Sequence, residues 1–278
     1  MPNQLVAGGV AVVAGGGSGI GRATVECLAE NGAAVEFFSN DQSANEELSS
    51  SLVERGFDVR GSTVNIASPD EVEAFFEDVA LHRGWLSVLV NSVGIQRYGT
   101  VETTSVETWD EVLNINLRGM FLTAKHALPL MRVNGSGSII NVSSAQAIAS
   151  QQNVVAYTAS KGAIVAMTRA MAVDYAAENI RVNSVCPGSV DTPMLRASAL
   201  SIDPVDPDRV IAEWGSGHPL GRVGRAREIA DTILFLASDL SSFVTGADLR
   251  VDGGVLAGVS LVAPSGASAT DQSRSVSA

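Results

Sequence analysis

Residues 10–31 read VAVVAGGGSGIGRATVECLAEN. Five apolar residues predict a buried strand, a glycine-rich turn follows at 15–21, and 22–31 has helical spacing up to Gly32, a natural C-cap. A strand, a glycine turn and a helix N-terminus bring backbone N–H groups to one point, which a pyrophosphate can approach without a Cβ in the way. The stretch therefore predicts a βα unit that binds a dinucleotide. It lacks the Gly-Lys-Ser/Thr ending of a nucleotide kinase loop.

The same alternation continues along the chain. Strands are predicted at 33–38, 58–64, 86–90, 138–142, 180–185 and 249–251, and helices at 45–55, 69–82, 106–131, 157–178 and 227–238. Several of the strands are continuous apolar runs rich in β-branched residues, as expected for parallel strands covered on both faces. The pattern indicates an α/β fold, with a doubly wound parallel sheet and helices on both faces.

Length and composition fit one large domain over residues 1–258. The chain has 278 residues, of which 46% are hydrophobic and 17% charged. Residues 188–224 contain four prolines and two short helical patterns, which predicts a lid over the substrate. Residues 259–278 are rich in Ser, Ala and Thr, and we expect a poorly ordered tail there.

Charge and cysteine usage narrow the class of protein. A net charge of -12 disfavours nucleic acid or an anionic membrane as partner. Without a leader-like N-terminus or an apolar run long enough to span a bilayer, we expect a cytoplasmic protein. Cys27 and Cys186 are expected to be buried in a reducing compartment. The three histidines have no metal-binding neighbours, so we expect no metal site.

A candidate acid–base pair lies in the stretch YTASK, which holds Tyr157 and Lys161. Spacing of four places both side chains on one face of a helix, where an ammonium can stabilise a phenolate and lower its pKa. Ser144 follows the predicted strand 138–142. A Tyr and a Lys four residues apart are common on amphipathic helices. The glycine turn in the same chain supports the catalytic interpretation of this pair.

Six motifs occur in order along the chain. They are the turn 15–21, the segments Asn91-Ser92-Val93-Gly94 and Asn116-Leu117-Arg118-Gly119, the pair Ser143-Ser144, Tyr157 with Lys161, and Pro187-Gly188 followed by Thr192-Pro193. Through these motifs the chain resembles, from about residue 5 to residue 258, the short-chain dehydrogenase/reductase family in its single-domain form of about 250 residues. The resemblance implies a Rossmann-type sheet of about seven strands, a nicotinamide cofactor and a homotetramer.

The resemblance also implies roles for individual residues. Tyr157 would exchange a proton with the substrate oxygen, Lys161 would tune it and hold ribose hydroxyls, and Ser144 would orient that oxygen. Asn116 would hold a water that connects Lys161 to solvent. The implied cofactor residues are Gly15, Gly17, Ser18, Gly19, Ile20, Gly21, Ser39, Asn40, Asn65, Ile66, Asn91, Ser92, Gly94, Tyr157, Lys161, Pro187, Gly188, Val190 and Thr192.

The choice of cofactor depends on the end of the second strand. Ser39-Asn40-Asp41 offers neither a clear Asp for NAD nor a cation for the extra phosphate of NADP. Ser18, Ser39 and Asn40 are uncharged, while Asp41, Glu46 and Glu47 make this end negative. NAD(H) is therefore favoured, and NADP(H) stays open because Arg22 is close in sequence.

These observations predict an NAD(P)-dependent alcohol dehydrogenase or carbonyl reductase acting on a small to medium secondary alcohol or ketone. Gln146 and Gln152, with two further amides between Ser144 and Tyr157, favour a polar substrate such as a polyol, sugar or hydroxylated ring, whereas Met194 and Trp214 could supply an apolar wall. Two alternatives are a 3-oxoacyl thioester reductase for carrier-protein or CoA substrates and a nucleotide-sensing regulator without turnover. The acidic charge argues against the first and the intact Tyr–Lys pair against the second.

Overall fold

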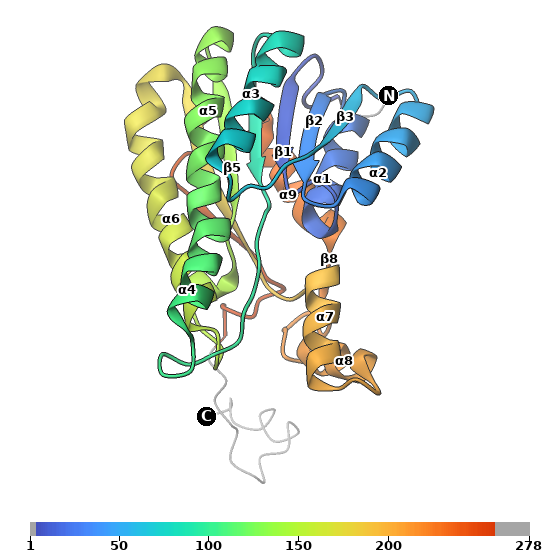
Figure 1. Ribbon diagram of the computed structural model, residues 1–278, viewed down its shortest axis with the longest axis vertical. Coiled ribbons are helices and arrows are strands. Elements are labelled where there is room, and N and C mark those ends of the chain that lie inside the picture. The colour runs from blue at the N-terminus through green and yellow to red at the C-terminus, as the bar shows by residue number, and fades with distance from the viewer. Residues whose placement is uncertain (1–3, 259–278) are drawn as a thin grey trace, which may run out of the picture.

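Seven parallel strands form the central sheet, in the order β3-β2-β1-β4-β5-β6-β9 (Figure 1). The computed structural model describes residues 4–258. The strands are β1 (Val10–Ala14), β2 (Ala34–Ser39), β3 (Val59–Thr63), β4 (Val88–Asn91), β5 (Gly137–Val142), β6 (Ile180–Pro187) and β9 (Asp248–Val251). The prediction of a doubly wound parallel sheet is confirmed. The predicted tail at 259–278 lies outside the described residues.

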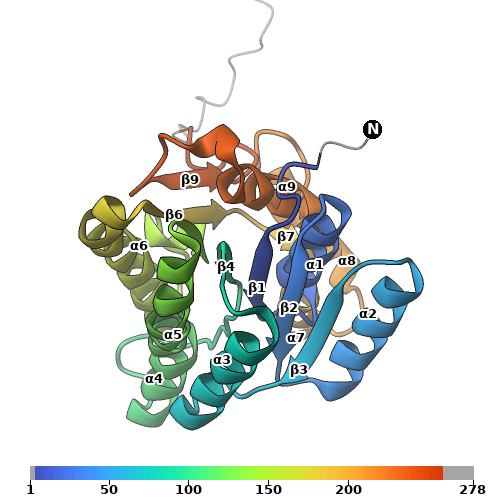
Figure 2. The same ribbon diagram turned by 90° about the horizontal axis from the view of Figure 1, so that it is seen from above.

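Helices cover both faces of this sheet (Figure 2). One apolar core joins α1, α2 and α9 to the sheet, and a second joins α3, α5 and α6 to its other face. The helices are α1 (Gly19–Glu30), α2 (Gln42–Glu54), α3 (Pro69–Arg83), α4 (Val106–Leu113), α5 (Gly119–Asn134), α6 (Val155–Tyr175), α7 (Pro193–Ile202), α8 (Pro207–Ser216) and α9 (Ala226–Ala237). Two short strands, β7 (Val190–Asp191) and β8 (Gly224–Arg225), pair with each other beside α7 and α8.

The order of the strands in the sheet reverses at β1: β2 and β3 lie on one side of β1, and the later strands lie on its other side. Ala11 pairs with Val35 of β2 on one side and with Val88 of β4 on the other. Strands β1 to β3 are added outward on one side, and β4, β5, β6 and β9 on the other. A ligand crevice forms beyond the carboxyl ends of the strands at such a reversal, because the two connections leave in opposite directions.

The expected helix at 106–131 is interrupted. Residues Asn114–Arg118 form a π-helical turn, labelled η1, between α4 and α5. A π turn inserts one extra residue into the helix and rotates the side chains on either side of it. Asn116 thereby points into the interior, where it is fully buried. Sequence periodicity predicted one continuous helix because the apolar residues on both sides of this turn keep their spacing.

A chain of buried polar side chains crosses the interior between the sheet and the helices of one face. The Nδ2 of Asn91 donates to Asn141 Oδ1 at 2.9 Å, and Asn141 Nδ2 donates to Thr168 Oγ1 of α6 at 2.9 Å. Thr123 of α5 donates to Asn91 Oδ1 at 2.6 Å. Each of these groups has a partner, which avoids the cost of burying an unpaired polar atom. The network fixes α5 and α6 on β4 and β5.

Both cysteines are buried, as predicted. Among residues 4–258, no helix has both the length and the apolar composition needed to cross a bilayer. The same part of the chain contains no group of three or more His, Cys, Asp or Glu residues arranged to hold a metal ion.

A buried carboxylate stabilises the edge of the sheet. Glu36 of β2 has a side chain that is only 1% exposed and bonds two guanidinium groups, Arg60 Nε at 2.9 Å and Arg83 Nε at 2.8 Å. Asp58 completes the pairing of Arg83 with two further bonds of 2.7 Å. This cluster joins β2, β3 and the end of α3.

We predict that Glu36→Ala lowers the free energy of unfolding by about 3 kcal/mol, because it removes two charge-assisted hydrogen bonds to a buried acceptor. Arg83 keeps only its bonds to Asp58, and Arg60 keeps only its pairing with Asp78. The matched control is Glu47→Ala, since Glu47 also pairs with an arginine but is 66% exposed. The control should cost less than about 1 kcal/mol. Urea denaturation of both variants provides the measurement, and equal losses would contradict the prediction.

Candidate active site

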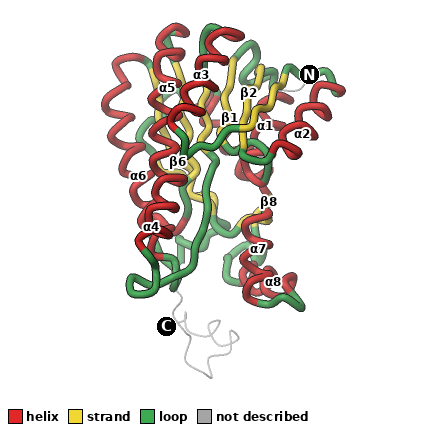
Figure 3. Tube along the Cα trace, viewed as in Figure 1, coloured by secondary structure: helices red, strands yellow, loops and turns green. Residues whose placement is uncertain are grey.

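A pocket of about 590 Å³ lies beyond the carboxyl ends of the strands, at the reversal between β1 and β4. Its lining comes from the loops that follow β1 to β6, from α6, α7 and α8, and from the loop after β9. Figure 3 shows α7 and α8 extending past this edge of the sheet. The volume lies in the range of small-molecule and cofactor sites.

The glycine turn forms one end of the pocket. Gly15 has φ +82°, and a Cβ there would lie 2.9 Å from the backbone nitrogen of Val93, so a side chain would be both strained and obstructed. Ser18, Gly19 and Ile20 line the pocket where α1 begins, and the first turn of α1 has no acidic residue. The N–H groups at the start of a helix and the positive end of its dipole favour an anion at this position. The residues present fit a pyrophosphate.

Two other predicted cofactor glycines have a packing role and do not line the pocket. A Cβ on Gly21 would lie 2.0 Å from the carbonyl oxygen of Gly15, and one on Gly17 would lie 2.5 Å from Ser39 Oγ. Both glycines therefore let α1 approach the turn and β2 closely.

Residues that follow β2, β3 and β4 form the adjoining wall. The predicted residues Ser39, Asn40, Asn65, Ile66, Ser92 and Gly94 all line the pocket. Asn65 Oδ1 already accepts a hydrogen bond from the backbone nitrogen of Ala67 at 3.0 Å. Arg22 is engaged by Glu47 at 2.9 Å and Glu26 at 3.3 Å, and it does not line the pocket. In the described structure this wall carries no cation.

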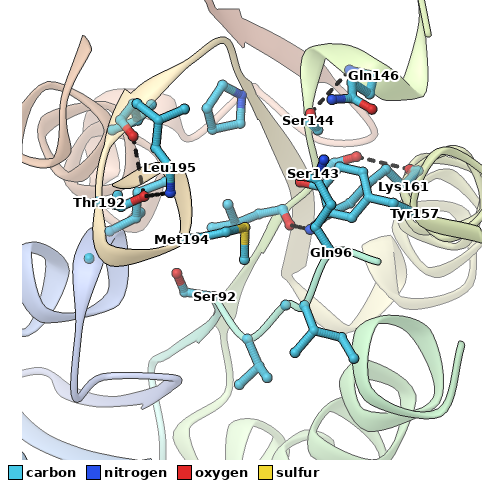
Figure 4. Close-up of a pocket in the computed structure, with 18 of the residues that line it drawn as sticks. Ser92, Gln96, Ser143, Ser144, Gln146, Tyr157, Lys161, Thr192, Met194 and Leu195 are labelled. Carbon is cyan, nitrogen blue, oxygen red and sulfur yellow. Dashed lines mark hydrogen bonds between the residues drawn. The ribbon is translucent and has the colours of Figure 1, made fainter. Parts of the chain in front are cut away.

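Ser144, Tyr157 and Lys161 converge in the same pocket (Figure 4). They are 8%, 8% and 3% exposed, respectively. Lys161 Nζ donates to the carbonyl of Val142 at 2.9 Å and lies 5.4 Å from the centroid of the Tyr157 ring. Ser144 Oγ accepts a hydrogen bond from the backbone nitrogen of Gln146 at 3.1 Å, which leaves the hydroxyl proton available to an oxygen in the pocket.

Burial controls the protonation of this pair. It raises the pKa of Tyr157 to about 12, an effect that the Ser144 hydroxyl partly opposes. It lowers the pKa of Lys161 to about 8. The expectation that the pKa of Tyr157 lies below its ordinary value is therefore wrong. The cause is desolvation of both groups, which disfavours the phenolate as well as the ammonium.

Asn116 holds the chain beside Lys161. Its Oδ1 accepts from the backbone nitrogen of Ile95 at 2.8 Å, and its Nδ2 donates to the carbonyl of Ile95 at 2.9 Å and to Ser160 Oγ at 3.1 Å. A Cβ on Gly94 would lie 3.4 Å from Lys161 Nζ and 3.8 Å from Asn116 Oδ1. These contacts position the Gly94–Ile95 segment. The role of Asn116 in holding a water stays a prediction.

The remaining predicted residues divide into two groups. Gln146, Pro187, Gly188, Val190, Thr192, Met194 and Trp214 line the pocket. Gln152 is exposed and does not line it, and Asn91 belongs to the buried network beneath it. Gln151, another of the amides predicted between Ser144 and Tyr157, also lines the pocket. The lining residues that the sequence analysis missed include Gln96, Tyr98, Ser150, Leu195, Ser198, His218, Val255 and Leu256. Most of these lie in loops, where no periodic pattern indicates which side chains face inward.

Comparison with known proteins agrees with this geometry. Residues 14–256 match a family model described as Enoyl-(Acyl carrier protein) reductase. The chain is 40% identical to cis-4-hydroxycyclohexanecarboxylate dehydrogenase of Sinomonas cyclohexanicum, over 89% of this chain and 96% of that protein. It is 37% identical to a 3-oxoacyl-(acyl-carrier-protein) reductase of Thermotoga maritima, over 90% of this chain and 98% of that protein.

A solved structure supports the same assignment. The aldohexose dehydrogenase of Thermoplasma acidophilum, in ligand-free form, superposes with a TM-score of 0.86 at 34% identity, covering 95% of this chain and 100% of that chain. Identities of this size over nearly the whole length show that the chain belongs to the short-chain dehydrogenase/reductase family.

Proposed function

We propose that this chain is an NAD-preferring dehydrogenase/reductase of hydroxylated rings, in which Tyr157 transfers the proton. The broader activity, that of an oxidoreductase for secondary alcohols and ketones, follows from the family and its relatives. The observation that carries the proposal is the convergence of Ser144, Tyr157 and Lys161 in the same pocket as the start of α1. Acid–base chemistry and an anion-binding turn thereby share one cavity.

The residues present fit a nicotinamide dinucleotide. The backbone of Ser18, Gly19 and Ile20 would hold its pyrophosphate, and Ser39 with Asn40 would meet the adenosine ribose. Gly188, Val190 and Thr192 line the side of the pocket that follows β6, where they would meet the nicotinamide. When bound, this cofactor accepts or supplies the hydride.

The protein side of the chemistry belongs to Ser144, Tyr157 and Lys161. Because burial raises the pKa of Tyr157 to about 12, the phenol holds its proton near neutral pH and can donate it to a ketone oxygen. Ser144 donates a hydrogen bond to that oxygen and so orients it. In the oxidation direction Tyr157 must take up a proton as phenolate, and the ammonium of Lys161 would stabilise that charge.

The lining supports a substrate with one polar and one apolar side. Gln146, Ser150 and Gln151 follow β5, while Met194, Leu195 and Trp214 come from α7 and α8. Gln146 Oε1 accepts a hydrogen bond from Thr158 Oγ1 at 3.4 Å, so its amide nitrogen is available to a ligand. Two relatives carry names that specify hydroxylated six-membered rings or aldohexoses. A polyol, sugar or substituted cyclohexanol fits both observations.

A second candidate is a 3-oxoacyl thioester reductase. The similarity to the reductase of Thermotoga maritima and the apolar side chains of α7 and α8 favour it. The net charge of -12 opposes docking of an acidic carrier protein.

We also propose that the segment 188–224 acts as a lid, that the cofactor is NAD(H) and that the protein is cytoplasmic. The family resemblance implies in addition that it is a homotetramer.

We predict that Tyr157→Phe abolishes turnover and leaves the affinity for the cofactor nearly unchanged, because it removes the proton and keeps the ring. Steady-state rates and cofactor titration by fluorescence provide the measurement. Retention of more than about a tenth of the wild-type activity would show that Tyr157 is not the acid–base group.

We predict that the wild type prefers NAD over NADP by at least about tenfold in kcat/KM, since the described wall at Ser39 and Asn40 has no cation for a 2′-phosphate. Asn40→Arg should shift the ratio toward NADP by supplying that cation, whereas the control Asn40→Gln should leave it unchanged. A wild type that prefers NADP would refute the assignment and implicate Arg22.

We predict that Gln146→Ala lowers kcat/KM for the best hydroxylated substrate by about tenfold, because it removes an amide from the polar wall. Gln152→Ala is the matched control, since this residue lies outside the pocket. A panel of polyols, sugars, cyclohexanols and 3-oxoacyl thioesters supplies the substrates. If only thioesters react, the second candidate replaces the first.

A further inference from the structure

We propose that His218 is a positioning residue that fixes three walls of the pocket relative to one another. It follows α8, is only 6% exposed and lines the pocket. The inference goes beyond the proposed function and depends on it only where turnover is measured. It concerns a side chain with no part in the proton transfer described above.

The two ring nitrogens of His218 bind different segments. Nδ1 lies 2.9 Å from the carbonyl oxygen of Trp214, which can only accept, so Nδ1 carries the proton. Nε2 accepts a hydrogen bond from the backbone nitrogen of Ser189 at 3.1 Å, so Nε2 carries none. The geometry thus requires the neutral imidazole with its proton on Nδ1. The ring connects the last turn of α8 to the residues that follow β6.

Two glycines form the niche that holds this ring. A Cβ on Gly188 would lie 2.8 Å from Nε2, and one on Gly253, where φ is +59°, would lie 3.4 Å from the ring. The backbone nitrogen of Leu220 donates to the carbonyl of Gly253 at 3.2 Å, which attaches the loop after β9 to the same place. The ring therefore packs between the end of β6 and the loop after β9.

Each of these three segments contributes a wall of the pocket. Trp214 comes from α8, Gly188 and Ser189 follow β6, and Val255 and Leu256 follow β9. A displacement of α8 would move the apolar wall away from the segment that is predicted to meet the nicotinamide. Such a displacement would weaken contacts that hold the alcohol equally in the ground state and the transition state, which raises KM and leaves kcat nearly unchanged.

Three substitutions of His218 remove its two hydrogen bonds one at a time or together. In His218→Gln the amide oxygen can occupy the position of Nε2 and accept from Ser189. In His218→Asn the shorter amide can reach Trp214 but not Ser189, and His218→Phe keeps a ring without either bond. We expect the Asn and Phe variants to raise KM for the alcohol by about tenfold while kcat changes less than about threefold, and the Gln variant to stay within about threefold in both.

Hydrogen–deuterium exchange gives a readout that needs no substrate. Exchange at Ser189 and in peptides of α7 and α8 should accelerate in the Asn and Phe variants and remain near wild type in the Gln variant. The control is His126→Gln, because His126 stacks on Phe76 and lies outside the pocket. It should change neither exchange in these segments nor KM.

The outcomes distinguish this inference from the proposed function. Any of three results would overturn the role of His218. The first is unchanged exchange and KM in the Phe variant, and the second is an equal rise of exchange and KM in the Gln and Phe variants. The third is a fall in kcat at constant KM. A wild type that oxidises no alcohol with either cofactor would instead defeat the proposed function, and the exchange measurements alone would then decide the inference.

Discussion

The site depends on one topological constraint, the reversal of strand order between β1 and β4. Every strand of the main sheet runs parallel, so all carboxyl ends lie at one edge, and the connections after β1 and β4 diverge there. The turn after β1 brings backbone N–H groups to this edge, and the loops after β5 and β6 bring Ser144 and Gly188. A sheet of the same strands in another order would separate the anion-binding turn from the acid–base residues.

The buried polar network gives this arrangement its precision. Asn91, Asn141 and Thr168 connect β4 and β5 to α6, the helix that carries Tyr157 and Lys161. Apolar packing tolerates small rotations of a helix, whereas a chain of directional hydrogen bonds in a dry interior does not. Lys161 adds a further bond to Val142 at the end of β5. The catalytic helix is thus fixed to the sheet by polar contacts at two levels along its length.

The sequence predicted most of the fold because β-branched apolar runs and helical periodicity are strong local signals. It failed at Asn114–Arg118, where a π turn leaves the apolar spacing on both sides intact. It predicted Ser144, Tyr157 and Lys161 through their spacing and resemblance, but not the raised pKa of Tyr157, because desolvation depends on the whole surrounding structure. Gln152 and Gln146 are indistinguishable by sequence pattern, and only the course of the loop puts one of them in the pocket. His218 gave no signal, since both of its partners are backbone atoms and one of them, the nitrogen of Ser189, is 29 residues away in sequence.

The loop after β9 has a consequence for how the protein is made. β9 pairs with β6, and Val255 and Leu256 line the same pocket as Gly15. A nascent chain that has emerged as far as Lys161 already contains the glycine turn and the tyrosine, yet it has no enclosed cavity for them to share. Bringing together residues so distant in sequence costs loop-closure entropy before their contacts stabilise the fold. A ligand that contacts Val255 and Leu256 can therefore stabilise the fold only after the chain has been synthesised through these residues.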